Sequence, residues 1–292
     1  MKQKQKAIFY MVISAFCFAC MNACVRLAGD LPAMQKSFFR NLVAMLFAAV
    51  LLVRSKEGFR FQKKNLPQLL LRSLFGTIGI LCNFYAVDHL ALSDASMLNK
   101  MSPFFAILFS YLLLREKLTL VQGAAVVTAF VGSLFIIKPT FANLNLGPAS
   151  IGLMGGLMAG AAYTFVRMLG QRGERGPFIV FFFSAFSCLS MVPWMIWGYV
   201  PMTAAQLLSL LGAGLAAAGG QFSITAAYCH APAREVSVYD YSQILFAAAL
   251  GFVLFGDVPD GYSVIGYVII CGTAILMFLY NTGVIGKKES AH

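Results

Sequence analysis

Long apolar stretches alternate with short polar segments along the whole of this 292-residue chain. A helix that crosses the hydrocarbon core of a bilayer needs about 20 predominantly apolar residues. Ten stretches meet that requirement, centred approximately on Phe18, Met45, Ile80, Phe104, Thr128, Gly160, Ala185, Leu215, Phe246 and Cys271. The pattern predicts an all-α integral membrane protein with ten transmembrane helices.

The two halves of the chain match each other when they are aligned at an offset of 141 residues. Arg26 then falls on Arg167, and Glu116 falls on Asp257. One offset that persists over about 90 residues indicates an internal duplication. Because five helices per copy is an odd number, the second copy enters the bilayer from the opposite side, and we expect two inverted five-helix repeats. We place the first repeat at 1–141, the second at 142–286, and a polar cytoplasmic tail at 287–292.

Small residues recur every four positions in two of the expected helices. Gly152, Gly156 and Gly160 form one such series, and Gly212, Ala216 and Gly220 form another. Ridges of small residues let a neighbouring helix backbone approach closely, so we predict tight helix packing at both.

Composition and charge agree with a membrane protein. Apolar residues make up 60% of the chain and charged residues only 11%, against about 25% charged in soluble domains. With the N-terminus inside, fifteen of the 22 basic residues fall in cytoplasmic segments, and only Lys36 and Lys138 fall outside. We therefore expect a multi-pass protein of the cell (inner) membrane with both termini in the cytoplasm.

The expected partners follow from the same charges. Orientation and anionic lipid headgroups account for the net charge of +11, so we expect no nucleic-acid partner. The lipid bilayer and a small-molecule substrate are the expected partners, and a homodimer is compatible with the sequence.

Several classes of chemistry find little support. The seven cysteines lie in apolar stretches, which favours reduced side chains. Cys17 and Cys20 form a C-x-x-C pair without a second pair or a histidine cluster, so we expect packing and no metal site. No Walker A motif occurs, and we expect no cofactor. Because His89 and His230 lie at opposite helix ends, an intramembrane enzyme is only a remote alternative, and we name no catalytic residue.

Two charges lie within the expected helices. A charge near the centre of a spanning helix costs at least about 2.5 to 3.5 kcal/mol, so it is seldom kept without a role. Lys100 and Asp240 both lie in the fourth helix of their repeat. With a rise of about 1.5 Å per residue, they lie at different depths, too far apart for an ion pair unless the helices tilt or break. We expect Arg167 to be the structural charge partner of Asp240, and Lys100 to lack an acid and meet the substrate.

Further polar and aromatic residues are candidates for a substrate cavity. They are Asn22, Arg40, Asn83, Tyr85, Asn99, Ser102, Tyr163, Gln221, Tyr239, Tyr241 and Gln243. An aromatic cavity with a few hydrogen-bonding groups suits a small amphipathic organic solute better than a bare ion. Asp240 is also the candidate for proton coupling, because its carboxylate would change surroundings as the cavity opens to each side. A purely structural polar network is the alternative for Lys100 and Asp240.

Several motifs together resemble the EamA-type transporters of the drug/metabolite transporter superfamily. The resemblance rests on Phe39-Arg40-Asn41, on the stretch from Ala95 through Ser102-Pro103 to Arg115-Glu116-Lys117, and on Gly123, Gly132, Gly266 and Gly272. It covers nearly the whole chain, although the second repeat carries Ile244 in place of the proline and Asp257 in place of the glutamate. The resemblance implies two five-helix repeats and alternating access through a central cavity.

The superfamily handles amino acids, nucleotide sugars, quaternary amines, S-adenosylmethionine and drugs, so the resemblance does not specify a substrate. We predict a gradient-driven secondary transporter of a small, anionic or zwitterionic, amino-acid-like metabolite. An exporter of cationic drugs or quaternary amines is the alternative, which Asp240 favours and Lys100 and Arg40 disfavour.

Overall fold

The computed structural model describes residues 3–89, 98–116, 119–137, 146–256, 261–282 and residue 285. The regular secondary structure of these residues is helical, with turns and irregular segments between the helices. The first half contains α1 (Gln3–Leu27), α2 (Ala33–Arg54), the 3-10 helix η1 (Lys63–Asn65), α3 (Leu66–His89), α5 (Ser102–Leu114) and α6 (Leu120–Ile137). The second half contains α7 (Leu146–Gln171), α8 (Gly176–Gly198), α9 (Ala204–His230), α10 (Ala233–Val236), the 3-10 helix η3 (Ser237–Tyr241), α11 (Ser242–Phe255) and α12 (Gly261–Thr282).

Seven helical runs in the described part of the chain are long and apolar enough to cross a membrane. They are α1, α2, α3, α7, α8, α9 and the run from Ala233 to Phe255 that contains α10, η3 and α11. Shorter apolar helices occupy Ser102–Leu114, Leu120–Gly132 and Val264–Tyr280. The all-α membrane class is therefore confirmed, and the full count of ten spans stays a prediction.

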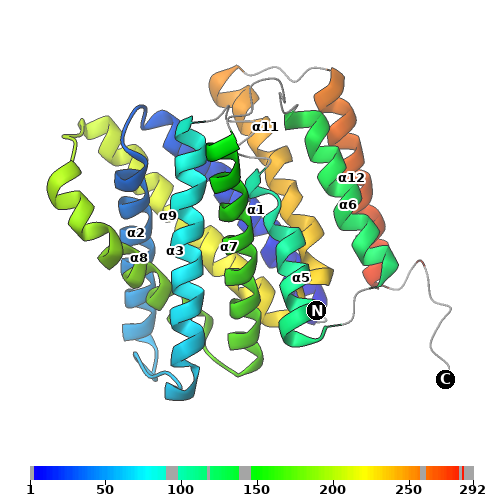
Figure 1. Ribbon diagram of the computed structural model, residues 1–292, viewed down its shortest axis with the longest axis horizontal. Helices are drawn as coiled ribbons and strands as arrows, with labels where there is room; N and C mark the ends of the chain where they lie inside the picture. Colours follow the sequence, from blue (N-terminus) through cyan, green and yellow to red (C-terminus); the bar gives the residue numbers. More distant parts are fainter. Residues whose placement is uncertain are drawn as a thin grey trace.

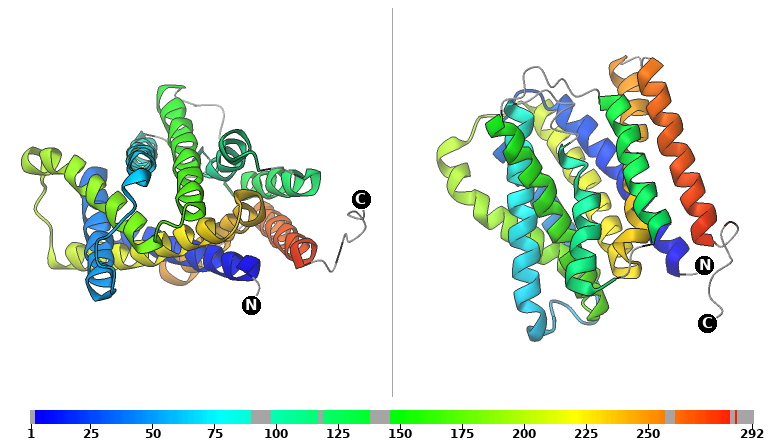
Figure 2. Two further views of the ribbon diagram at one scale, coloured as in Figure 1. Left: turned by 90° about the horizontal axis from the view of Figure 1, so that it is seen from below. Right: turned by 45° about the vertical axis from the view of Figure 1, so that its right-hand side comes forward.

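The two halves of the chain interleave. The most extensive helix contacts join α1 to α9, α3 to α7, α2 to α8, and α6 to α12. The repeat offset relates α1 to α7 and α3 to α9, so the first two contacts are equivalent under the repeat. Helices α6 and α12 lie side by side at one edge of the molecule, and α2 and α8 lie towards the opposite edge (Figures 1 and 2). The centre is thus built by helices from both halves.

The distribution of side chains suits a lipid solvent. Large apolar side chains face outwards, among them Trp197 at 83% exposed and Val253 at 75%. Arg72, Lys100 and Asp240, in contrast, are buried. Charged groups inside a membrane protein face the bundle interior and mark functional sites. We therefore expect a functional site in the interior of this helix bundle.

The small-residue ridges lie at close helix contacts, as predicted. A Cβ atom on Gly156 would lie 2.6 Å from the carbonyl oxygen of Leu98, and one on Gly160 would lie 2.5 Å from the Cβ of Phe105. On α9, a Cβ on Gly220 would lie 2.8 Å from the ring of Phe18. Helix α7 thus packs directly on the segment that precedes and begins α5.

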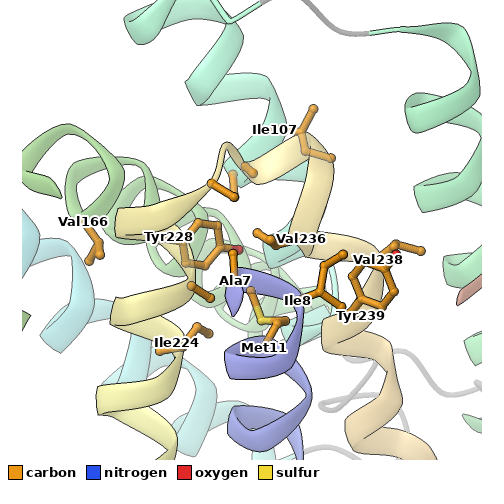
Figure 3. Close-up of a cluster of buried hydrophobic side chains, with 14 of the residues drawn as sticks. Ala7, Ile8, Met11, Ile107, Val166, Ile224, Tyr228, Val236, Val238 and Tyr239 are labelled. Carbon is orange, nitrogen blue, oxygen red and sulfur yellow. The ribbon is translucent and has the colours of Figure 1, made fainter. Parts of the chain in front are cut away.

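The main apolar cluster holds the interrupted second-half helix in place. Met11 of α1, Ile224 and Tyr228 of α9, and Val236 and Val238 on either side of the α10–η3 junction belong to this cluster (Figure 3). Each of these side chains is at most 2% exposed. Because such packing leaves little room for movement, the backbone of η3 has a defined position.

Candidate functional site

Each repeat interrupts its fourth apolar helix at an equivalent place. In the first half, α5 begins at Ser102, and Pro103 lies in its first turn. Proline suits this position because it lacks the N–H that would otherwise be unpaired there. In the second half, η3 separates α10 from α11. At the repeat offset, Asn99 to Ser102 fall on Asp240 to Gln243, so both interruptions coincide although only the first contains a proline.

Lys100 and Asp240 meet where the two interruptions face each other. The Nζ of Lys100 lies 3.2 Å from Oδ2 of Asp240 and donates to Oε1 of Gln243 at 2.9 Å. The hydroxyl of Tyr241 donates to the carbonyl oxygen of Lys100 at 3.0 Å. Lys100 is 7% exposed and Asp240 is 6% exposed. A buried ion pair with supporting hydrogen bonds therefore joins the two halves.

This pair shows that the prediction that Lys100 lacks an acid is wrong, and it meets the condition under which the sequence allowed an ion pair, a break in the helices. Lys100 and Asp240 form a direct ion pair, and Lys100 does not lack an acid. The estimate of depth assumed two continuous α-helices. The 3-10 turn at η3 and the interruption before α5 change the local rise and direction of the two segments. The side chains of Lys100 and Asp240 therefore reach the same depth.

Arg167 has a different partner from the one expected. Its Nε donates to Oε1 of Glu116 at 3.0 Å, and its Nη1 donates to the carbonyl oxygen of Cys229 at 3.3 Å. Arg167 therefore ties the end of α5 to the end of α9, and it is not the charge partner of Asp240. The reason is positional, because Arg167 lies near the end of α7, where α5 and α9 also end, whereas η3 turns Asp240 towards Lys100.

Tyrosines connect the Lys100–Asp240 pair to a second group of charges. The rings of Tyr163 and Tyr228 stack with centroids 5.0 Å apart, and the hydroxyls of Tyr228 and Ser237 are 3.4 Å apart. Tyr163 also interacts electrostatically with Asp240, Arg72 and Arg40. The second group therefore lies near the first, on the side of α2 and α3.

Arg40 and Arg72 make up this second group. The Nε of Arg40 lies 3.2 Å from the sulfur of Met21, and its guanidinium lies 6.0 Å from the ring centre of Phe18. The guanidinium of Arg72 lies 4.1 Å from the ring centre of Phe183. Among the described residues, neither arginine has an acidic partner.

Arg72 was not among the residues singled out from the sequence. It stands two turns from the start of an apolar helix, a position where arginine usually extends its head group to the membrane surface. The structure buries it instead, at 2% exposed. The feature of the sequence that accompanies this burial is Gly76, one turn further along. In the structure, a Cβ at Gly76 would collide with the Arg72 guanidinium and the Phe183 ring.

The other candidates divide into two sets. Ser102, Gln221, Tyr239 and Tyr241 are buried, and Asn83, Asn99, Tyr163 and Gln243 are partly buried. Asn22 is exposed near the end of α1, and Tyr85 is 40% exposed and stacks on His89 at the end of α3. The structure thus brings Lys100, Asp240, Tyr241 and Gln243 together in one network, and it does not bring Asn22 and Tyr85 into it.

The chain was compared with known proteins. The model of the EamA-like transporter family matches twice, at residues 5–138 and 148–279. The pseudopaline exporter CntI of Pseudomonas aeruginosa is 33% identical over 276 residues, covering 94% of this chain and 96% of the exporter. The riboflavin transporter of Vibrio cholerae is 27% identical over 272 residues, covering 89% of each chain.

Further similarities agree with this result. Solute carrier family 35 member G1 of Homo sapiens is 26% identical over 296 residues, covering 96% of this chain and 79% of the carrier. One crystal structure superposes with a TM-score of 0.83 at 15% identity, covering 97% of this chain and 99% of that chain, which shows that the fold is shared. The chain belongs to the EamA-like transporter family, within the drug/metabolite transporter superfamily, and is a multi-pass membrane transporter.

Proposed function

We propose that this transporter is gradient-driven and moves a small amphipathic organic metabolite, anionic or zwitterionic, across the membrane by alternating access. The Lys100–Asp240–Gln243 network at two interrupted helices carries this proposal. In inverted-repeat transporters, substrate and coupling-ion sites lie near the bilayer midplane, where discontinuous helices of the two repeats meet. The Lys100–Asp240 pair lies where interrupted helices of the two halves meet, which supports this proposal.

The ion pair supplies a way to couple the substrate to protons. A proton on Asp240 removes the charge that holds Lys100, and Lys100 is then free to bind an anionic group of the substrate. Loss of the proton restores the pair and displaces the substrate. Asp240 is thus the proposed proton-coupling residue, with Lys100 and not Arg167 as its cation.

The charges of the interior favour an anionic or zwitterionic substrate over a cationic drug. Lys100 neutralises Asp240, whereas Arg40 and Arg72 have no acidic partner in the described part of the chain. Such an interior repels a cation. The relatives named for pseudopaline and riboflavin support an organic solute.

The orientation is also part of the proposal. Ten spans with both termini in the cytoplasm place the basic segments on the inner side of the cell membrane.

The proposed substrate-binding residues are Lys100, Asn99, Ser102, Tyr163 and Gln221.

Transport by purified protein in proteoliposomes tests the function. We expect an imposed pH gradient to drive accumulation of solutes from a radiolabelled panel of dicarboxylates and amino acids, but not of quaternary amines. The Lys100→Met variant should lose this activity, and Arg54→Gln, at an exposed position of α2, should keep it. Accumulation of the quaternary amines alone, or accumulation indifferent to every imposed gradient, would contradict the proposal.

A further inference from the structure

Two buried arginines lack an acidic partner among the described residues. Arg40 on α2 is 9% exposed and Arg72 on α3 is 2% exposed. Both lie in the interior, where Arg40 lies against Phe18 and Met21 and Arg72 lies against Phe183. A buried charge is strongly unfavourable unless it is paired. The two side chains therefore keep an unfavourable arrangement that an anion would relieve.

The acidic side chains that the structure describes are either engaged elsewhere or exposed. The structure describes six acidic side chains, and four of them pair with other bases: Glu57 with Arg175, Glu116 with Arg167, Glu235 with Lys4, and Asp240 with Lys100. Glu174 accepts hydrogen bonds from Gln62 and Asn65, and Asp30 is exposed in a turn. None of these six is available to Arg40 or Arg72.

The surroundings of Arg72 leave polar groups open. Its Nε is buried and has no hydrogen-bond partner, and the same holds for the hydroxyls of Ser73 and Ser184. One turn further along both helices, Thr77 and Ser187 lie 2.6 Å apart and satisfy each other. Almost all buried polar groups in proteins have a partner, so an unpaired group calls for an explanation such as a missing ligand.

We propose that Arg40 and Arg72, together with Tyr163, form a subsite for an oxyanion group of the substrate, a carboxylate or a phosphoryl group. This inference rests on the proposed transport function and narrows its substrate class. Lys100 and the two arginines are the buried cations among the described residues. Of the two buried carboxylates described, Asp240 pairs with Lys100, whereas Glu174 accepts hydrogen bonds from Gln62 and Asn65. A substrate with two negative charges would balance the surplus, with one group at the arginines and one at Lys100.

The chemistry of guanidinium favours an oxyanion over a halide. Its planar fork matches two oxygens of a carboxylate or phosphate in a bidentate arrangement. The hydroxyl of Tyr163 is a further hydrogen-bond donor. Because both arginines are buried in this conformation, the anion reaches them when alternating access opens the bundle.

Binding can be measured separately from transport. The full-length protein in detergent is heated in succinate, inorganic phosphate, chloride or tetramethylammonium at one ionic strength, and its two tryptophans report unfolding. We expect succinate or phosphate to raise the melting temperature, and the stronger of the two identifies the oxyanion. Arg40→Gln and Arg72→Gln should each weaken the apparent affinity at least about tenfold, since each removes charge-assisted hydrogen bonds. Arg54→Gln should match the parent protein.

A conservative variant guards against misfolding. Arg72→Lys keeps the charge but loses the fork, and we expect an affinity between those of the parent and Arg72→Gln. An equal effect of chloride, no effect of any anion on the parent, or parent-like affinity in both glutamine variants would overturn the subsite. Transport that is absent while anion binding is intact would refute the proposed function alone. If transport takes place but is changed neither by added anions nor by either arginine variant, the subsite alone is refuted.

Discussion

The ion pair between Lys100 and Asp240 makes a quantitative prediction about stability. The Lys100→Met change removes a contact of 3.2 Å to the Asp240 carboxylate and a hydrogen bond of 2.9 Å to Gln243. It leaves the Asp240 carboxyl group, which is 6% exposed, without its cation. Removing one partner of a buried pair typically costs about 3 to 5 kcal/mol, because the remaining charge is uncompensated. Asp240→Asn should cost a similar amount by leaving Lys100 unpaired.

The double variant distinguishes this explanation from simple loss of contacts. Replacement of a whole buried pair by neutral residues of similar volume is often close to neutral. We therefore expect Lys100→Met combined with Asp240→Asn to be more stable than either single variant. Lys100→Met is accordingly expected to reduce stability as well as transport, so its transport is to be interpreted beside that of the double variant.

Unfolding by a denaturing detergent measures the free energy of unfolding of the parent protein, the two single variants and the double variant. An ordinary side-chain hydrogen bond between membrane helices contributes only about 0.6 kcal/mol on average. A cost of that size for Lys100→Met, or a cost for the double variant equal to the sum of the two single costs, would refute the ion-pair reasoning.

Three more predictions concern topology, coupling and the arginine subsite. An impermeant thiol reagent on intact cells should label an introduced cysteine at Ala204 but reach one at Gln62 only after permeabilisation, both positions being exposed, and labelling of intact cells at Gln62 would overturn the inverted topology. Asp240→Asn should abolish the response of transport to a pH gradient in proteoliposomes while permitting exchange between equal pools, and an unchanged response would make Asp240 purely structural. Gly76→Ala should displace the Arg72 guanidinium, because the new Cβ collides with it, and should weaken succinate or phosphate binding in the melting assay; an unchanged affinity would place the anion elsewhere.

The sequence by itself determined that this protein lies in a lipid bilayer, and it determined the order of its helices. A bilayer imposes a fixed apolar length on each spanning segment, so hydropathy alone locates the helices. The offset of 141 residues indicated the repeat and placed Lys100 one residue from the position equivalent to Asp240. The cost of burying charge in lipid then selected these two residues as candidates before any geometry was known.

Only the tertiary structure decided which charges meet. Helices α5 and α11 consist almost entirely of apolar residues, so the sequence carries no polar stripe that would show which side faces the interior. The break at η3, which brings Asp240 to Lys100, depends on packing against α1 and α9. No proline within η3 signals this break in the sequence. Arg72 and the Arg167–Glu116 pair were likewise decided by the packing of helices distant in sequence, because a side chain near a helix end can extend to the membrane surface or turn inward.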